Sequence, residues 1–242
     1  METTAGTLLG GRLRYAQPAE GYRTGIEPVL LAAAIPARPG ERVLEGGTGA
    51  GAGLMCLAAR VPGVLGLAVE IDGAMAELAR QNIAANGLSG LEVRALDLME
   101  TELAGFDHAF ANPPWHDARS TPSPVVRRRL AKQAAEGTLE EWIGALLRAL
   151  RPEGTITLVL PAALADRVTA ALREPDIVPL LPKAGRAPKL VLVHAAKPGA
   201  GKRISAGREP IILHEGDGRY TPEIEAVLRD GAALSLGRSL RA

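Results

Sequence analysis

The amino-acid sequence predicts an α/β fold with a doubly wound, mostly parallel sheet of seven strands and an antiparallel edge strand. Short apolar runs alternate with segments of helical periodicity between residues 43 and 172. Such alternation forms right-handed βαβ units, which place the strands parallel and cover both faces of the sheet with helices. The last two apolar runs, residues 177–181 and 190–195, have no helical pattern between them. They are therefore expected to form the antiparallel edge.

The individual elements follow from apolar spacing and from the residues that end each segment. The helix at 73–86, for example, has an apolar residue every three or four positions and stops at Gly87, a residue typical of helix ends. Trp142 repeats at helical spacing with Leu146 and is expected in the core. The core strands are expected at residues 43–44, 64–69, 91–96, 106–111, 155–160, 177–181 and 190–195. The core helices are expected at residues 50–60, 73–86, 138–150 and 162–172.

Three regions are expected along the chain, namely residues 1–40, 41–196 and 197–242. The first is an N-terminal extension with a hairpin at 8–15 and a helix at 29–35, and the second is the core domain. The third is a tail with a Gly-rich basic loop and a short helix packed on the core. That helix is expected to start at Thr221-Pro222 and to run through Leu228, with Pro222 at the first helical position.

The composition excludes several classes of protein. With 47% apolar and 23% charged residues, the chain of 242 residues has the composition and length of one α/β domain with appendages. The single cysteine, Cys56, excludes a disulfide framework, and the four His show no metal-ligand spacing. The chain shows neither a signal sequence nor the roughly 18 to 20 apolar residues of a membrane span. We therefore expect a cytoplasmic protein with no metal and no membrane partner, and its oligomeric state stays open.

The net charge of +1 hides an uneven distribution of charges. Residues 1–118 carry 8 Lys and Arg against 14 Asp and Glu, whereas residues 119–242 carry 20 against 13. Within the second half, residues 118–135 and 177–208 are basic and contain no acid. The basic residues of the first of these segments are Arg119, Arg127, Arg128, Arg129 and Lys132. This pattern favours a polyanionic partner for one face, with solvated basic loops as the alternative.

A glycine-rich turn at residues 45–51, Glu-Gly-Gly-Thr-Gly-Ala-Gly, lies between the first core strand and its helix. Doubly wound sheets bind nucleotide-like ligands at the carboxyl ends of their strands. Glycines there let the backbone turn tightly and approach a ligand without a Cβ in the way. The turn therefore predicts a nucleotide-type cofactor, with NAD binding as the competing interpretation.

Two acids end the next two strands. Glu70 stands 19 residues after Gly51, where a carboxylate can accept hydrogen bonds from both hydroxyls of an adenosine ribose. Such a ribose belongs to NAD and to S-adenosylmethionine alike. Asp97, 27 residues further on, can accept from the exocyclic amine of a cofactor adenine, which NAD sites do not usually require. The two acids together favour S-adenosylmethionine.

The sequence becomes specific at Asn112-Pro113-Pro114-Trp115, which follows the fourth strand. Two prolines bar continuation of the strand or of a helix, so the chain leaves the sheet in a rigid turn. The Asn112 side chain and the Pro113 carbonyl can both accept hydrogen bonds from a planar amine such as N6 of adenine. Holding both N–H groups aims the nitrogen lone pair out of the ring plane, toward an electrophile. Trp115 offers a stacking face, worth about 1–3 kcal/mol for a nucleobase.

From about residue 21 to residue 195 the sequence resembles the Rossmann-like class I S-adenosylmethionine-dependent methyltransferases that methylate amines and carry an Asn/Asp-Pro-Pro-aromatic motif. Within that group it is most similar to the tRNA1(Val) adenine-N6 methyltransferases. The leader motif of that family matches residues 21–27, and the stretch at 213–222 is similar too. Three positions depart from the family pattern: Glu45 is usually Asp, Gly46 is usually larger, and Trp115 is usually Tyr or Phe.

The resemblance implies in-line transfer of the sulfonium methyl of S-adenosylmethionine to the N6 amine of an adenine in the anticodon loop of a tRNA. The implied catalytic residues are Asn112, Pro113, Pro114 and Trp115. The implied cofactor-binding residues are Glu45, Gly47, Thr48, Gly49, Gly51, Glu70, Ile71, Asp97, Leu98 and Asn112. The implied contacts to substrate or RNA are Tyr22, Arg23, Thr24, Arg127, Arg128, Arg129 and Lys132.

Two alternatives stay open. The same tetrapeptide serves methylation of glutamine in release factors and of guanine N2 in ribosomal RNA. The release-factor enzymes usually carry an N-terminal helical domain, and only about 40 residues precede the first core strand here. The second alternative is a non-catalytic nucleotide- or NAD-binding module, which leaves the tetrapeptide and Asp97 unexplained.

Overall fold

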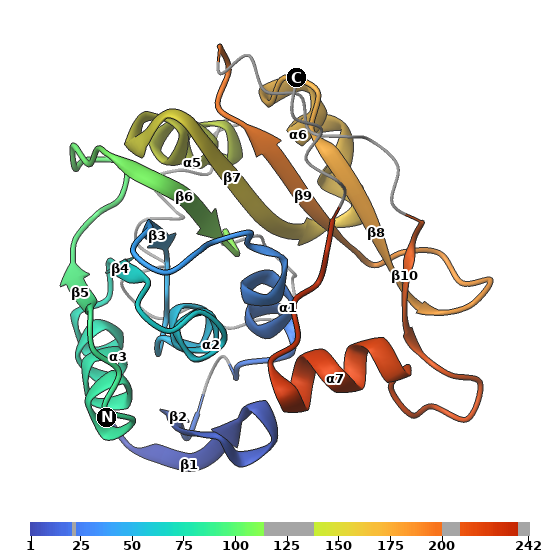
Figure 1. Ribbon diagram of the computed structural model, residues 1–242, viewed down its shortest axis with the longest axis horizontal. Coiled ribbons are helices and arrows are strands. Elements are labelled where there is room, and N and C mark those ends of the chain that lie inside the picture. The colour runs from blue at the N-terminus through green and yellow to red at the C-terminus, as the bar shows by residue number, and fades with distance from the viewer. Residues whose placement is uncertain (21–22, 114–137, 200–208, 237–242) are drawn as a thin grey trace.

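The computed structural model describes residues 1–20, 23–113, 138–199 and 209–236 (Figure 1). Its strands are β1 (Thr3–Leu8), β2 (Leu13–Pro18), β3 (Arg42–Gly46), β4 (Leu65–Glu70), β5 (Leu91–Ala95), β6 (Phe106–Ala111), β7 (Leu150–Pro161), β8 (Asp176–Lys183), β9 (Leu190–Ala196) and β10 (Ile211–His214). Its helices are α1 (Glu27–Ala34), α2 (Ala52–Arg60), α3 (Gly73–Ala85), α5 (Thr138–Ala149), α6 (Ala165–Ala171) and α7 (Pro222–Asp230). Two short 3₁₀ turns, η1 (Leu9–Gly11) and η2 (Ala162–Leu164), complete the set.

The central sheet has eight strands in the order β10-β8-β9-β7-β6-β3-β4-β5. Strand β9 runs antiparallel to both of its neighbours, and the other neighbouring pairs are parallel. The predicted α/β class with a mostly parallel, helix-covered sheet is confirmed. Most core elements lie within two residues of their expected bounds, although β7 begins earlier than expected and takes up a register shift against β6.

The edge of the sheet differs from the prediction in two respects. The antiparallel strand β9 lies inside the sheet, between β7 and β8. The edge is an eighth strand from the tail, β10, which pairs in parallel with β8 at Ile211↔Leu180 and Ile212↔Leu181. Strand β10 satisfies backbone groups that β8 would otherwise leave unpaired at the edge. Its four residues are too few to show a periodic pattern in the sequence.

The inner strands β3, β6 and β7 bury side chains on both faces of the sheet. Val43 lies in one core and the adjacent Leu44 in the other, as alternation along a strand requires. Helices α1, α2, α3 and α7 contribute to the first core, and α5 and α6 to the second. Cys56 lies in the first core, and burial raises the pKa of its thiol to about 12.

The N-terminal hairpin is longer than the predicted range of 8–15. Its strands β1 and β2 extend beyond that range on both sides, with the turn η1 between them. Gly10 and Gly11 adopt φ angles of 62° and 96° there, a region that glycine enters without steric cost. The two glycines therefore make the turn and displace the strands outward.

Asn82 of α3 and Asn86, which caps the carboxyl end of that helix, bond to the backbone of β2 as a neighbouring strand would. The Asn82 side chain accepts from the backbone N–H of Ala16 and donates to its carbonyl, both at 2.8 Å. Asn86, one turn later, does the same with Arg14, again at 2.8 Å. Asn82 also donates to the carbonyl of Ala50 at 2.9 Å, in the glycine-rich turn. Helix α3 thereby joins the N-terminal hairpin to that turn.

The tail helix α7 begins at Pro222 as predicted and packs against α1. Its Ile224 and Val227 are buried in the first core, and the backbone N–H of Leu234, beyond the helix, donates to the Ala33 carbonyl at 2.8 Å. Helix α7 and the chain that follows it run beside α1 in Figure 1. The tail therefore covers part of the same sheet face as the N-terminal helix.

Candidate active site at the carboxyl edge of the sheet

Four neighbouring parallel strands end side by side at one edge of the sheet. Gly46 of β3 pairs with Val69 of β4 and with Ala111 of β6, and Glu70 of β4 pairs with Ala95 of β5. Adjacent strands lie about 4.8 Å apart. The structure therefore brings together the glycine-rich turn, the two strand-end acids and the start of the tetrapeptide, which are widely separated in sequence.

The glycine-rich turn has a backbone that requires glycine. Gly47, Gly49 and Gly51 adopt φ angles of 67°, 57° and 92°. The backbone N–H of Gly47 donates to the Val69 carbonyl at 2.8 Å, which ties the turn to the end of β4. A Cβ at Gly51 would stand 3.2 Å from the Cβ of Ala79 in α3, so this glycine also permits close helix packing.

Glu45 supports the turn from beneath. Its carboxylate is buried and accepts from the Thr48 hydroxyl and, at 3.0 Å, from the backbone N–H of Leu54 in α2. Burial raises the pKa of Glu45 to about 7. A Cβ at Gly53 would lie 2.1 Å from Glu45 Oε1, so Gly53 makes room for the carboxylate. Sequence reasoning missed Gly53, because it falls outside the glycine spacing of the turn.

Glu70 joins the turn to the end of β4. One oxygen accepts from the backbone N–H of Gly49 at 2.8 Å and the other from that of Asp72 at 2.9 Å. Burial raises the pKa of Glu70, and these two backbone hydrogen bonds oppose the rise. A carboxylate has about four acceptor positions in all, so Glu70 keeps acceptor capacity for a ligand hydroxyl beside its backbone hydrogen bonds.

Asp97 and Leu98 lie just beyond the end of β5. Asp97 is half-buried, and its Oδ1 accepts from the backbone N–H of Met99 at 2.9 Å, which fixes the turn after the strand. Leu98 is buried and packs toward the glycine-rich turn: a Cβ on Gly46 would lie 2.7 Å from its Cδ2. Ile71, after Glu70, is half-buried at the neighbouring strand end.

Trp142 of α5 lies under the same turn, which the sequence pattern did not indicate. The prediction that this residue is in the core is confirmed, with 7% of its surface exposed. A Cβ on Gly47 would stand only 2.9 Å from the indole ring. Helical spacing predicted that Trp142 points inward, but only the packing of α5 on the sheet brings it to the turn.

The predicted catalytic and RNA-contacting residues are only partly described. Asn112 is half-buried and Pro113 is buried directly after β6, beside the end of β3. Arg23 is exposed, and the Thr24 hydroxyl forms a 2.7 Å hydrogen bond with the Tyr15 hydroxyl of the hairpin. The predicted residues outside the described part of the chain are Tyr22, Pro114, Trp115, Arg127, Arg128, Arg129 and Lys132.

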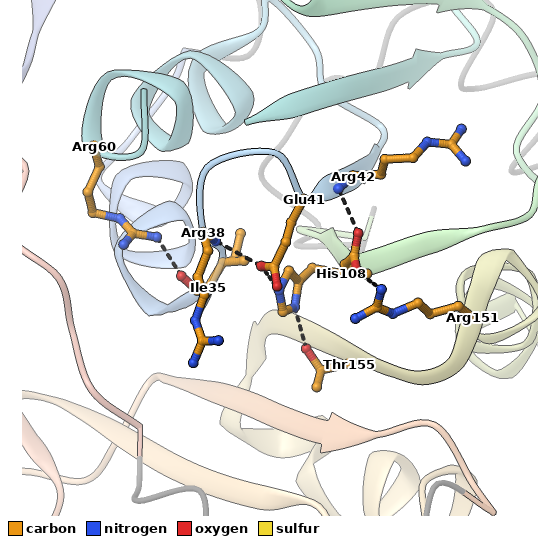
Figure 2. Close-up of polar contacts among 9 residues, drawn as sticks. Ile35, Arg38, Glu41, Arg42, Arg60, His108, Arg151 and Thr155 are labelled. Atoms are coloured by element: carbon orange, nitrogen blue, oxygen red, sulfur yellow. Dashed lines mark hydrogen bonds and ion pairs between the residues drawn. The ribbon is translucent and has the colours of Figure 1, made fainter. Parts of the chain in front are cut away.

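The amino ends of the strands carry a separate polar cluster (Figure 2). His108 of β6 bonds to the Thr155 hydroxyl at 2.7 Å through Nδ1 and to Glu41 at 3.0 Å through Nε2. The Glu41 carboxylate also accepts from the backbone N–H of Arg38 at 2.8 Å. The residues of this polar cluster are hydrogen-bonded to one another and link neighbouring strands at the amino ends of the sheet. Among the described residues no group of His, Cys, Asp and Glu is arranged to hold a metal ion.

Comparison with known proteins shows one consistent relationship. Residues 26–169, more than half of the chain, match the model of the methyltransferase small domain family. A tRNA1(Val) (adenine(37)-N6)-methyltransferase of Bacteroides thetaiotaomicron is 32% identical over 179 residues, which cover 71% of this chain and 75% of that protein. A protein of the same name from Parabacteroides distasonis is 29% identical and covers 86% of this chain and 90% of its own length.

The solved structures agree on the fold. A predicted O-methyltransferase of Agrobacterium tumefaciens aligns with a TM-score of 0.70 at 24% identity, over 86% of this chain and 98% of that one. At this identity the likeness concerns the fold alone. In the described part of the chain, no helix combines the length and apolarity needed to cross a bilayer.

Proposed function

The chain belongs to the methyltransferase small domain family and is an S-adenosylmethionine-dependent methyltransferase, and from this premise we propose that it methylates the N6 amine of an adenine in the anticodon loop of a tRNA. Membership in a methyltransferase family rules out the alternative of a non-catalytic NAD-binding module. The observation that carries the proposal is the position of Asn112 and Pro113, at the end of the strand next to the glycine-rich turn.

The residues at the carboxyl edge suit the cofactor. Glu70 keeps acceptor capacity for the ribose hydroxyls, and Asp97 offers an acceptor to the adenine amine. Leu98 and Ile71 stand at adjacent strand ends, where apolar side chains can contact the two faces of a purine. The positive φ angles at Gly47 and Gly49 let the backbone of the turn bend tightly beside the strand ends.

Catalysis in this proposal is chiefly positioning. When bound, S-adenosylmethionine supplies an electrophilic methyl group. The Asn112 side-chain carbonyl accepts one N–H of the target amine and the Pro113 backbone carbonyl accepts the other, which directs the nitrogen lone pair at the methyl carbon. The nitrogen–carbon bond forms as the carbon–sulfur bond breaks. The amine then gives up one proton, which Asn112 holds at hydrogen-bond distance until water takes it.

Two observations support tRNA as the substrate class. The relatives quoted above are named for adenine 37 of a tRNA. The second half of the chain also carries an excess of basic residues, as a polyanionic partner requires. A base must leave its stack to enter a cleft, at a cost of a few kcal/mol. That cost is least in a single-stranded loop, which favours the anticodon loop over a duplex.

The decisive experiment is methyl transfer to defined RNAs. The protein is incubated with labelled S-adenosylmethionine and unmodified, transcribed tRNAs, with total ribosomal RNA and release factors in parallel reactions. Digestion to nucleosides should show label in N6-methyladenosine from a tRNA. Label in N2-methylguanosine or in protein glutamine would replace the proposed substrate with one of the alternatives.

A further inference from the structure

The loop between β8 and β9 is a compact basic segment. Lys183, Arg186 and Lys189 fall within seven residues, and no acid lies between them. Arg186 and Lys189 are exposed, whereas Lys183 is half-buried at the end of β8. These residues belong to the longer basic stretch at 177–208.

Strand β10, which the sequence did not predict, brings a second segment beside this loop. His214 of β10 pairs with Lys183 of β8, and Lys183 Nζ donates to the Gly216 carbonyl at 3.0 Å. The β8–β9 loop and the turn between β10 and α7 therefore lie side by side, at the right of the view in Figure 1. Both follow the carboxyl ends of parallel strands.

The β10–α7 turn is held rigid by its own contacts. The rings of His214 and Tyr220 stack with centroids 4.7 Å apart. The backbone N–H of Glu215 donates to the Arg219 carbonyl at 2.8 Å. A preformed surface loses less conformational entropy when a partner binds.

The acids of this turn do not cancel the positive charge of the surface. Arg219 forms an ion pair with Asp217 at 2.7 Å, which holds the pKa of that carboxyl below its usual range. Lys183 adds to the same effect. Glu215 is the second acid of the turn. The two segments together carry four basic side chains, on Lys183, Arg186, Lys189 and Arg219, against two acidic ones, and both basic residues of the β8–β9 loop itself are exposed.

The surface lies on the same edge of the sheet as Asn112. Strand β8 is separated from β6 by β9 and β7, which is three strand spacings, or about 14 Å. An RNA whose base enters beside Asn112 keeps its neighbouring nucleotides outside the cleft. A separation of this size is within the span of a few such nucleotides, so one RNA can occupy both places.

From this placement we infer that the β8–β9 loop, stiffened by the β10–α7 turn, binds the phosphate backbone of the substrate RNA outside the methylated loop. The inference rests on the proposed function, because it names a contact of the same substrate. Arg186 and Lys189 make the phosphate contacts, and Lys183 fixes the loop to the turn. These contacts carry no sequence information and position the RNA for entry of the base.

The test compares two charge reversals at opposite ends of one strand. One variant is Arg186→Glu, at a residue after the carboxyl end of β8. The other is Arg173→Glu, at a residue in the exposed turn before the amino end of β8. Binding of a fluorescent, unmodified tRNA transcript is measured by anisotropy at several salt concentrations. Arg186→Glu should weaken binding about fivefold or more at 0.1 M salt and lower the salt slope by about one. Arg173→Glu should change the dissociation constant less than about twofold.

Three outcomes decide between this inference and the proposed function. If the wild-type protein binds and methylates the tRNA and Arg186→Glu binds it equally well, the inference that this loop binds RNA is overturned and the proposed function stands. Equal losses of tRNA affinity in Arg186→Glu and Arg173→Glu would also overturn the inference, because the effect would then come from net charge alone. A wild-type protein that neither binds nor methylates tRNA would overturn both. Thermal unfolding and cofactor affinity, unchanged in both variants, show that the fold is intact.

Discussion

The indole ring of Trp142 fills the space that a side chain on Gly46 would need. A Cβ on Gly46 would lie 3.0 Å from Cζ3 of the ring, and one on Gly47 would lie 2.9 Å from Cη2. Methyltransferases that this sequence resembles usually have a larger residue at the position of Gly46. Here helix α5 supplies the missing volume from the other side, so the departure in sequence is compensated in space.

Truncating Trp142 should therefore damage the glycine-rich turn. Trp142→Ala removes a buried ring from beneath the turn, and we expect the free energy of unfolding to fall by about 3–5 kcal/mol. The dissociation constant for S-adenosylmethionine should rise at least tenfold, because the turn loses its support. Urea unfolding and titration calorimetry measure the two effects.

The matched control is Ile143→Ala, which truncates the next residue of the same helix at 1% exposure. This variant should lose about 2–5 kcal/mol and keep its cofactor affinity. If both variants lost affinity in proportion to stability, Trp142 would be a core residue with no special relation to the turn.

Replacing Gly53 should be destabilising, against the preference of a helix. Alanine in a helix interior is ordinarily about 1 kcal/mol more favourable than glycine. At position 53 the added Cβ would lie 2.1 Å from Glu45 Oε1, so Gly53→Ala must displace the buried carboxylate. We expect a loss of about 1–3 kcal/mol in the free energy of unfolding.

A double-mutant cycle tests the cause of that loss. In a Glu45→Ala background the clash is absent, so Gly53→Ala should become neutral or stabilising. The same penalty in both backgrounds would place the strain elsewhere in α2. Denaturant midpoints for the four proteins give the coupling energy.

The stability of the protein should fall as pH rises through neutrality. Burial raises the pKa of Glu45 from its ordinary value of 4.5 to about 7. The folded state therefore holds this proton more tightly than the unfolded chain, and the stability it contributes is complete below pH 4.5 and is lost as pH rises through 7. The loss is on the order of 3 kcal/mol. Glu70, whose pKa is also raised by burial, acts in the same direction.

Glu45→Gln isolates the contribution of this one carboxyl. The glutamine cannot ionise, so between pH 5 and pH 7.5 the variant should gain on the wild type by on the order of 3 kcal/mol. Parallel stability curves for the two proteins, measured by urea unfolding at each pH, would show that Glu45 titrates normally.

Asn112 should matter far more for methyl transfer than for cofactor binding. Asn112→Ala removes an acceptor for the target amine, and we expect kcat to fall at least about 100-fold. The dissociation constant for S-adenosylmethionine should stay within about twofold of the wild-type value. Asn112→Asp keeps an acceptor at this place and should recover part of the activity. An equal loss of turnover and cofactor affinity in Asn112→Ala would make the residue structural.

Most of the fold could be predicted because its signals are local. Several short motifs each mark the end of a strand within a few residues. They are the glycine-rich turn, the acids at the ends of β4 and β5, and the Asn112-Pro113 turn. Helix α3 was located by its apolar spacing and by Gly87, and α7 by Pro222. The prediction failed at the edge of the sheet, because strand pairing depends on residues that are far apart in the chain. Neither β10 nor the interior position of β9 has a local pattern that distinguishes it.

The sequence by itself determined the α/β class, the order of its elements and the residues that meet at the carboxyl edge, because periodicity and turn chemistry act between neighbours in the chain. Only the tertiary structure decided what supports that edge. Trp142 beneath Gly46, Gly53 beside Glu45, and the turn after β10 beside Lys183 are all packing relationships. They arise when helices and strands close on one another, so they depend on distances in space that no spacing in the sequence records.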